Sequence, residues 1–196
     1  METTATSVER PQRADARRNR QRILDAARRV FAAEGIDSQM DAVARTAGVG
    51  VGTVYRHFPD KEALLGELVR EKFARLGDLV GEALETEGEP FELLSALLHR
   101  HCEEVEGDAG LQHALKTSGE GVWGRAATER AELEQLTAEL MRRAVDQGTL
   151  RTDARVADIG LIMCGVSATM ALADEPGGWR RHLELALDGL RPRTGS

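Results

Sequence analysis

The stretch that decides the fold runs from Ser38 to Lys61 and reads SQMDAVARTAGVGVGTVYRHFPDK. Apolar residues recur at helical spacing over Met40–Ala47, so this segment is predicted to form a short helix with one buried face. Ser38 and Asp41 have the spacing of a capping box, in which the hydroxyl and the carboxylate each accept a hydrogen bond from an unpaired backbone amide. Gly48 follows where a left-handed residue ends a helix, because glycine takes a positive φ without steric cost.

A second short helix is predicted over Val51–His57. Its inward side consists of Val54, followed by Phe58, whereas Pro59 and Asp60 end the helix and cap the next one. The outward side combines small, hydroxyl-bearing and basic residues: Val51, Gly52, Thr53, Tyr55, Arg56 and His57. Two short helices joined by a glycine turn, the second with such an outer face, are typical of a helix-turn-helix that enters a DNA groove.

The residues from Ala44 to Leu64, ARTAGVGVGTVYRHFPDKEAL, resemble the signature of the TetR (tetracycline-repressor) family of regulators. The preceding Arg22–Gly35, RILDAARRVFAAEG, resembles the first helix of that family. Gly50 stands where the family usually has a serine and Gln39 where it usually has a threonine, so two hydroxyls that contact phosphate in the family are absent here. The resemblance implies an all-α fold of about nine helices, with a DNA-binding head and a helical body for ligand binding and dimerisation.

The same resemblance, together with the chemistry of the outer face, gives a set of DNA contacts. Base edges are expected to be read or supported by Gln39, Arg45, Thr53 and Arg56. Phosphates are expected to bind Tyr55, His57, Lys61 and an arginine arm at the start of the first helix. The arm consists of Arg10, Arg13, Arg17, Arg18, Arg20 and Arg22. Gly52 lets the backbone approach the groove closely, and Val51 is a further expected DNA contact on the same outer face. For the arginine arm, the alternative is a solvated start of the first helix.

Composition agrees with a helical protein built from leucine, alanine and valine, because 41% of the residues are hydrophobic and only 4% are aromatic. The net charge of −7 is unevenly spread: residues 1–59 hold ten arginines and seven acidic residues, and the remainder accounts for a balance of −10. Three segments are expected: a flexible arm over residues 1–15, a helix-turn-helix domain over 16–62 and a ligand-binding and dimerisation domain over 63–196.

A cytoplasmic location is expected. Cys102 and Cys164 follow no metal or redox spacing and are predicted to be buried thiols of an intracellular protein. The start of the chain lacks the apolar segment of a signal peptide. The longest uncharged run, Ile159–Ala173, has fifteen residues, fewer than the roughly 20 that span a bilayer.

Beyond the head, the pattern predicts a series of helices and a pairing of the last two between subunits. The expected helices are Asp60–Leu84, Pro90–Glu106, Leu111–Leu115, Ala126–Gln147, Ala154–Ala173 and Trp179–Leu190. Because Ala154–Ala173 is apolar nearly all round, it has to be covered on all sides. We expect it to form a homodimer interface with the last helix, through Ile159, Ile162, Met163, Val166, Met170, Leu183 and Leu187. The alternative is that these residues form the core of a single chain.

A small apolar or amphipathic effector is the other partner that the resemblance implies. The candidate pocket residues are polar, aromatic or polarisable side chains on otherwise apolar faces: Phe73, Leu97, His101, His113, Trp123, Leu140, Met141 and Met163. The glycine-rich segment Lys116–Gly124 is predicted to be a pocket lid. No metal ligand set, no cofactor motif and no catalytic constellation is found; GVGVG at 48–52 has the wrong spacing for a dinucleotide loop.

The sequence therefore predicts a regulator and not an enzyme: a homodimeric repressor that binds palindromic double-stranded operator DNA, without membrane partners, and is released by its effector. Two alternatives stay open. The first is a DNA-binding dimer without an effector. The second is a helical protein-interaction module whose DNA affinity has weakened through Gly50 and Gln39.

Overall fold

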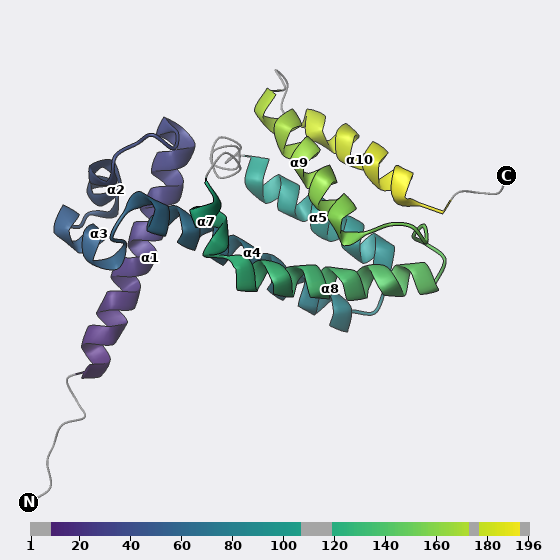
Figure 1. Ribbon diagram of the computed structural model, residues 1–196, viewed down its shortest axis with the longest axis horizontal. Coiled ribbons are helices and arrows are strands. Elements are labelled where there is room, and N and C mark those ends of the chain that lie inside the picture. The colour runs from purple at the N-terminus through teal and green to yellow at the C-terminus, as the bar shows by residue number, and fades with distance from the viewer. Residues whose placement is uncertain (1–8, 107–118, 173–176, 193–196) are drawn as a thin grey trace, which may run out of the picture.

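The computed structural model describes residues 9–106, 119–172 and 177–192, which form helices throughout and no strand. The head consists of α1 (Glu9–Glu34), α2 (Met40–Ala47) and α3 (Val51–His57). The long helix α4 (Lys61–Glu85) leads from the head into the body (Figure 1). The body contains α5 (Pro90–Glu106), α7 (Glu120–Gly124), α8 (Ala127–Asp146), α9 (Val156–Leu172) and α10 (Gly178–Leu190). The predicted all-α fold is confirmed.

The core of the head forms where α1, α2 and α3 meet the first three turns of α4. Ile23, Phe31, Val43 and Val54 are each fully buried, and Leu64 of α4 joins them. Their side chains follow the 3.6-residue period that the sequence shows, so one apolar face of each helix is removed from water.

A second core holds the body together. It joins residues of α4, α5, α8, α9 and α10, among them Phe91, Leu140, Val166 and Trp179. Figure 1 shows α9 and α10 side by side at the far end from the head, and α8 along α4. None of the helices in the described ranges is long and apolar enough to cross a membrane.

In the turn between α2 and α3, Gly48 ends α2 in a left-handed conformation, as predicted. Gly48 has φ +66° and its amide donates to the carbonyls of Ala44 and Arg45, which ends α2. Asp60 also behaves as predicted, because its Oδ1 accepts a hydrogen bond of 2.6 Å from the amide of Ala63 and so caps α4.

The predicted capping box is wrong by one residue. The helix begins at Met40, so Gln39 and not Ser38 occupies the N-cap, and its side chain makes no capping hydrogen bond. The hydroxyl of Ser38 instead donates to the carbonyl of Gly35 at 2.8 Å and closes the turn after α1. The hydroxyl of Ser38 can bond either to the start of α2 or to the turn that precedes it. In this structure it bonds to the turn, at the carbonyl of Gly35.

Two further differences concern the start of the chain and a cysteine. α1 begins at Glu9, so helix extends into residues 9–15, where the sequence analysis expected a flexible arm. Cys102 is buried as predicted, whereas Cys164 is exposed. The reason for the second difference is that Cys164 lies on a side of α9 that no other described segment of the chain covers.

Candidate nucleic-acid interface

The turn at residues 48–50 fixes α3 against α2. The amide of Val49 donates to the carbonyl of Ala44 at 3.1 Å, and the carbonyl of Gly50 accepts the amide of Thr53 at 2.8 Å. Val54 and Phe58 are buried on the inner side of α3. The orientation of α3 is therefore set by backbone hydrogen bonds and by two buried side chains.

The outer face of α3 leaves apolar and polar groups open to solvent. Val51 and Tyr55 are 37% and 46% exposed, and they are two of only four large hydrophobic side chains exposed among the residues whose burial is described. Gly52 and Arg56 are exposed beside them. Exposed apolar side chains gathered on one short helix mark a contact surface.

The side chains predicted to read bases remain available. The guanidinium of Arg56 makes one long hydrogen bond of 3.5 Å to the hydroxyl of Thr53 and is otherwise directed to solvent. Arg45 is exposed in the last turn of α2. Gln39 is exposed, and its amide donates to the carbonyl of Asp37 at 3.3 Å. Arg56 lies on α3, Arg45 on α2 and Gln39 in the turn before α2. These are the elements of a helix-turn-helix that lie at or beside the DNA groove.

His57 differs from the other basic residues on this face. Its ring is half-buried at the end of α3, and burial, with the charges of Arg20 and Arg56 nearby, lowers the pKa of His57. The neutral ring is thereby favoured. A neutral imidazole donates a hydrogen bond to a phosphate but adds no positive charge.

The arginine arm divides into outward and inward residues. Arg17 and Arg18 are exposed on α1, and Arg18 pairs with Asp15 one turn away. Arg22 instead donates to the carbonyl of Ala47 at 2.8 Å, where it stabilises the end of α2. Arg20 is bound to Glu67 of α4 at 2.9 Å. A run of arginines in the sequence gives no sign of which of them bind within the chain.

Lys61 and the start of α4 carry less free positive charge than the sequence suggests. The ammonium of Lys61 lies 5.9 Å from the centre of the Phe31 ring, a cation–π contact. The carboxylate of Asp60 already occupies one of the amides at this helix end. A phosphate bound here therefore shares the helix end with Asp60.

The predicted pocket residues differ in their burial within the described part of the chain. His101, Leu140 and Met141 are buried, and Leu97 and Met163 are partly buried. The rings of Phe73 and Trp123 lie 6.0 Å apart, tilted against each other. His113 and the predicted helix Leu111–Leu115 lie outside the described residues.

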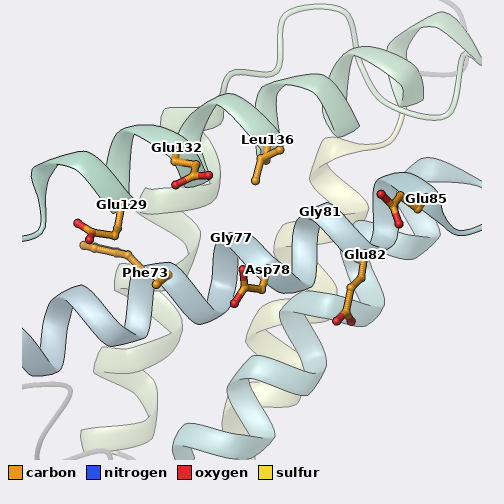
Figure 2. A pocket seen from close by; sticks show the side chains of 10 residues that line it. Phe73, Gly77, Asp78, Gly81, Glu82, Glu85, Glu129, Glu132 and Leu136 are labelled. Carbon is orange, nitrogen blue, oxygen red and sulfur yellow. The ribbon is translucent and has the colours of Figure 1, made fainter. Parts of the chain in front are cut away.

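A groove of about 460 Å³ runs between α4 and α8, and Phe73 is the one predicted pocket residue that lines it. Figure 2 shows its floor at Gly77 and Gly81 of α4, with Leu136 of α8 above. Its walls are acidic: Asp78, Glu82, Glu85, Glu129 and Glu132.

The predicted dimer residues lie largely inside the single chain. Ile159, Val166, Leu183 and Leu187 are buried in the body core, and Ile162, Met163 and Met170 pack against it. The side of α9 that stays exposed carries other residues: Ala157, Gly160, Leu161, Cys164, Ala168 and Ala171. Leu161 is 71% exposed and Leu185 of α10 is 54% exposed. The uncovered apolar surface is therefore displaced by about half a helical turn from the predicted one.

Comparison with protein-family models identifies both parts of the chain. Residues 23–68 match the model described as bacterial regulatory proteins, tetR family. Residues 89–192 match the model of the C-terminal domain of SbtR-like transcriptional regulators. Among curated proteins, the HTH-type transcriptional repressor KstR of Mycobacterium tuberculosis is 30% identical over 133 residues, which cover 67% of this chain and 60% of KstR.

Solved structures extend the likeness over nearly the whole fold. The TetR transcriptional regulator SCO0520 from Streptomyces coelicolor is 37% identical, with a TM-score of 0.64 over 89% of this chain and 99% of that chain. A TetR transcription regulatory protein from Mycobacterium vanbaalenii is 36% identical, with a TM-score of 0.66 over 92% of this chain and 99% of that chain. The chain belongs to the TetR family of bacterial transcriptional regulators.

Proposed function

We propose that the protein is a homodimeric repressor that binds a palindromic operator through α3 and is released from it by a small ligand. The observation that carries the proposal is the outer face of α3, where Val51, Gly52, Tyr55 and Arg56 are exposed together on a helix held rigidly by its turn. KstR is named a transcriptional repressor, which supports repression rather than activation for this chain.

Dimerisation is supported by the uncovered side of α9. Leu161 and Leu185 are the only other large hydrophobic side chains exposed among the residues whose burial is described. They lie on the two neighbouring helices α9 and α10, and a second copy that packs there would remove them from water. Two copies related by a two-fold axis present two α3 helices to successive major grooves, whose centres lie about 34–36 Å apart.

An effector site in the body is supported by one buried polar group. His101 is 7% exposed, and its Nδ1 has no hydrogen-bond partner within the described part of the chain. An unpaired buried nitrogen costs free energy unless another group satisfies it. A hydroxyl or carbonyl of an apolar or amphipathic ligand would do so.

The experiment that tests the function is selection of bound sequences from a random duplex library at physiological salt, with the purified full chain. Enrichment of a palindrome with two equal half-sites is the expected result. Recovery of unenriched DNA would contradict the proposal and favour a protein-interaction role for the body.

The effector is tested separately, by release of the protein from the selected palindrome. A library of apolar and amphipathic small molecules is screened for release, and each hit is repeated with His101→Phe, which keeps an aromatic ring but lacks both nitrogens. A hit that releases the wild type but not the variant supports the site. If the chain binds the palindrome and no compound releases it, the effector-free dimer is favoured.

A further inference from the structure

The body sends a short segment into the core of the head. We call residues 119–129, which comprise α7 and the start of α8, the strap. Val122 and Ala126 of the strap are 4% and 0% exposed and belong to the same buried cluster as Ile23 and Leu24 of α1. The apolar core of the head is therefore completed by residues about 100 positions further along the chain.

The strap lies along the first half of α4 at close range. A Cβ atom added to Gly121 would meet the carboxyl carbon of Glu62 at 2.7 Å, and one added to Gly66 would meet the Cβ of Arg125 at 3.0 Å. Further along, Trp123 packs against Phe73. Gly66 thus allows a separation between α4 and Arg125 that a larger residue would prevent, whereas the group at Gly121 is the end of the flexible Glu62 side chain.

Charged groups join the same three elements through one carboxylate. Glu67 of α4 accepts Arg20 of α1 at 2.9 Å and Arg70 of α4 at 2.6 Å. The other end of Arg70 binds Glu129 of the strap at 3.0 Å. Glu67 is the most enclosed member, with its side chain 14% exposed. Burial alone would raise its pKa, but hydrogen bonds from Arg70 and Arg20 lower the pKa of Glu67 below the ordinary value, so the carboxylate stays ionised.

Arg20 carries this connection to the recognition helix. Its guanidinium lies 4.8 Å from the centre of the Phe58 ring, a cation–π contact. Phe58 is the C-cap of α3, where its amide donates to the carbonyl of Val54 at 2.8 Å. The contacts therefore run without a gap from Glu129 in the body to the end of α3.

We propose that Glu67 and Glu129 are positioning residues, which fix the angle of α3 relative to the body through Arg70 and Arg20. The inference rests on the proposed binding of DNA by α3. Glu129 belongs to α8 and not to α2 or α3, and its effect on binding is exerted through the ion pairs. Loss of Glu129 removes the one of Arg70's two carboxylates that belongs to the strap, and loss of Glu67 leaves Arg20 without its carboxylate. Either loss breaks the connection between strap and α1 and lets the head change its angle to the body, so the two heads of a dimer meet their half-sites less well.

The test compares Glu129→Gln with Glu132→Gln. Both variants remove one carboxylate from α8, one turn apart, so their long-range electrostatic effect on DNA is nearly the same. Glu132 has no ion-pair partner among the described residues, which makes it a matched control. We measure affinity for the selected palindrome and for random DNA, and the spacing between half-sites that each variant accepts.

The expected result is that Glu129→Gln weakens specific binding about threefold to tenfold relative to Glu132→Gln. Affinity for random DNA should be equal in the two variants, and Glu129→Gln should accept a wider range of half-site spacings. The melting temperature should change little, because partly exposed ion pairs contribute little to stability. A lower melting temperature with unchanged spacing preference would show a structural role only and would overturn the inference.

A double substitution tests whether the two carboxylates act along one path. In the Glu67→Gln background, Glu129→Gln should cause no further loss of specific affinity, because the connection is already broken. Additive losses would contradict a shared path. If the wild type itself does not select a palindrome, the proposed function fails; if it does and Glu129→Gln matches Glu132→Gln, only the present inference fails.

Discussion

At the scale of single residues, Arg56 and Tyr55 are expected to play different parts in DNA binding. Arg56 is exposed with one long internal hydrogen bond, so Arg56→Ala should remove a base contact worth about 1–3 kcal/mol and relax the preference at one position per half-site. Tyr55→Phe removes only a hydroxyl and should weaken all sequences alike. Selection with each variant, followed by affinity measurements on specific and random duplexes, separates the two. Equal losses on both duplexes for Arg56→Ala would exclude base reading.

His101 provides a prediction of pH dependence. Burial, and secondarily the charges of Lys72 and Arg75, lowers the pKa of His101 from 6.5 to about 3. The unfolded chain binds a proton below pH 6.5 that the folded chain refuses, so stability is complete above that pH and falls as the pH falls towards 3. Between pH 8 and pH 5 the loss from this residue should be about 2 kcal/mol.

The substitution His101→Phe isolates the loss of stability that is due to protonation of His101. Urea unfolding of both proteins at pH 8 gives the difference due to packing alone, and the same comparison at pH 5 adds the difference due to ionisation. The variant should lose about 2 kcal/mol less than the wild type between the two pH values. Parallel pH profiles would mean that His101 is protonated in the folded chain.

Which single residues could be predicted depended on how local their partners are. Gly48 and Asp60 were predicted because a cap needs only its own helix end. The predicted capping role of Ser38 was wrong, because two neighbouring backbone groups compete for its hydroxyl. Arg20 and Arg22 looked like arm residues, yet their partners lie 47 and 25 positions away on other helices, which no local pattern encodes.

At the scale of elements, the turn before α3 offers a test of its unusual glycine. Gly50 is the N-cap of α3 with φ −67°, and nothing lies within 4 Å of an added Cβ. A serine there fits without strain and its hydroxyl can accept an amide of the first turn, so Gly50→Ser should stabilise the protein by about 0.3 kcal/mol. Gly50→Ala, which lacks the hydroxyl, should destabilise it by roughly 0.5 kcal/mol.

DNA affinity is a second measurement to make on Gly50→Ser and Gly50→Ala. The resemblance places a phosphate-binding hydroxyl at this position, so Gly50→Ser should bind specific and random DNA more tightly than Gly50→Ala, by equal factors. Equal DNA affinity of both variants would show that position 50 does not reach a phosphate.

Apart from the start of α1, helices with a regular apolar face were predicted to within a residue or two, whereas the strap was not recognised. Met40–Ala47, Val51–His57 and Pro90–Glu106 have their predicted bounds. The strap was interpreted as part of a pocket lid, because one valine and one tryptophan among glycines show no period. Its burial depends on the head, and a helix of five residues has no stability of its own.

At the scale of the whole molecule, the division between head and body is not a division between cores. Leu64, Leu65, Leu68 and Val69 of α4 and Val122 of α7 belong to the core of the head. All of them fall in the predicted second domain, because the predicted boundary after residue 62 lies within the first turn of α4. A DNA-binding fragment cut at residue 62 would therefore expose much of its core.

The uncovered side of α9 leads to the last prediction, which concerns assembly. Leu161 is 71% exposed at its centre. In a two-fold dimer each substitution acts twice, so Leu161→Glu should remove at least about 3 kcal/mol of burial and weaken association by roughly 100-fold or more. Ala138→Glu, on an exposed side of α8, introduces the same charge and is the control.

Sedimentation at a series of protein concentrations measures the association, and binding to full and half palindromes measures its consequence. Leu161→Glu should sediment as a monomer where Ala138→Glu is a dimer, with an unchanged melting temperature of the isolated chain. It should bind a full palindrome no better than a half-site, because the second α3 is no longer tethered to the first. A Leu161→Glu protein that remains dimeric would place the interface elsewhere. Loss of the palindrome advantage with dimerisation intact would instead mean that α9 sets the distance between the two heads.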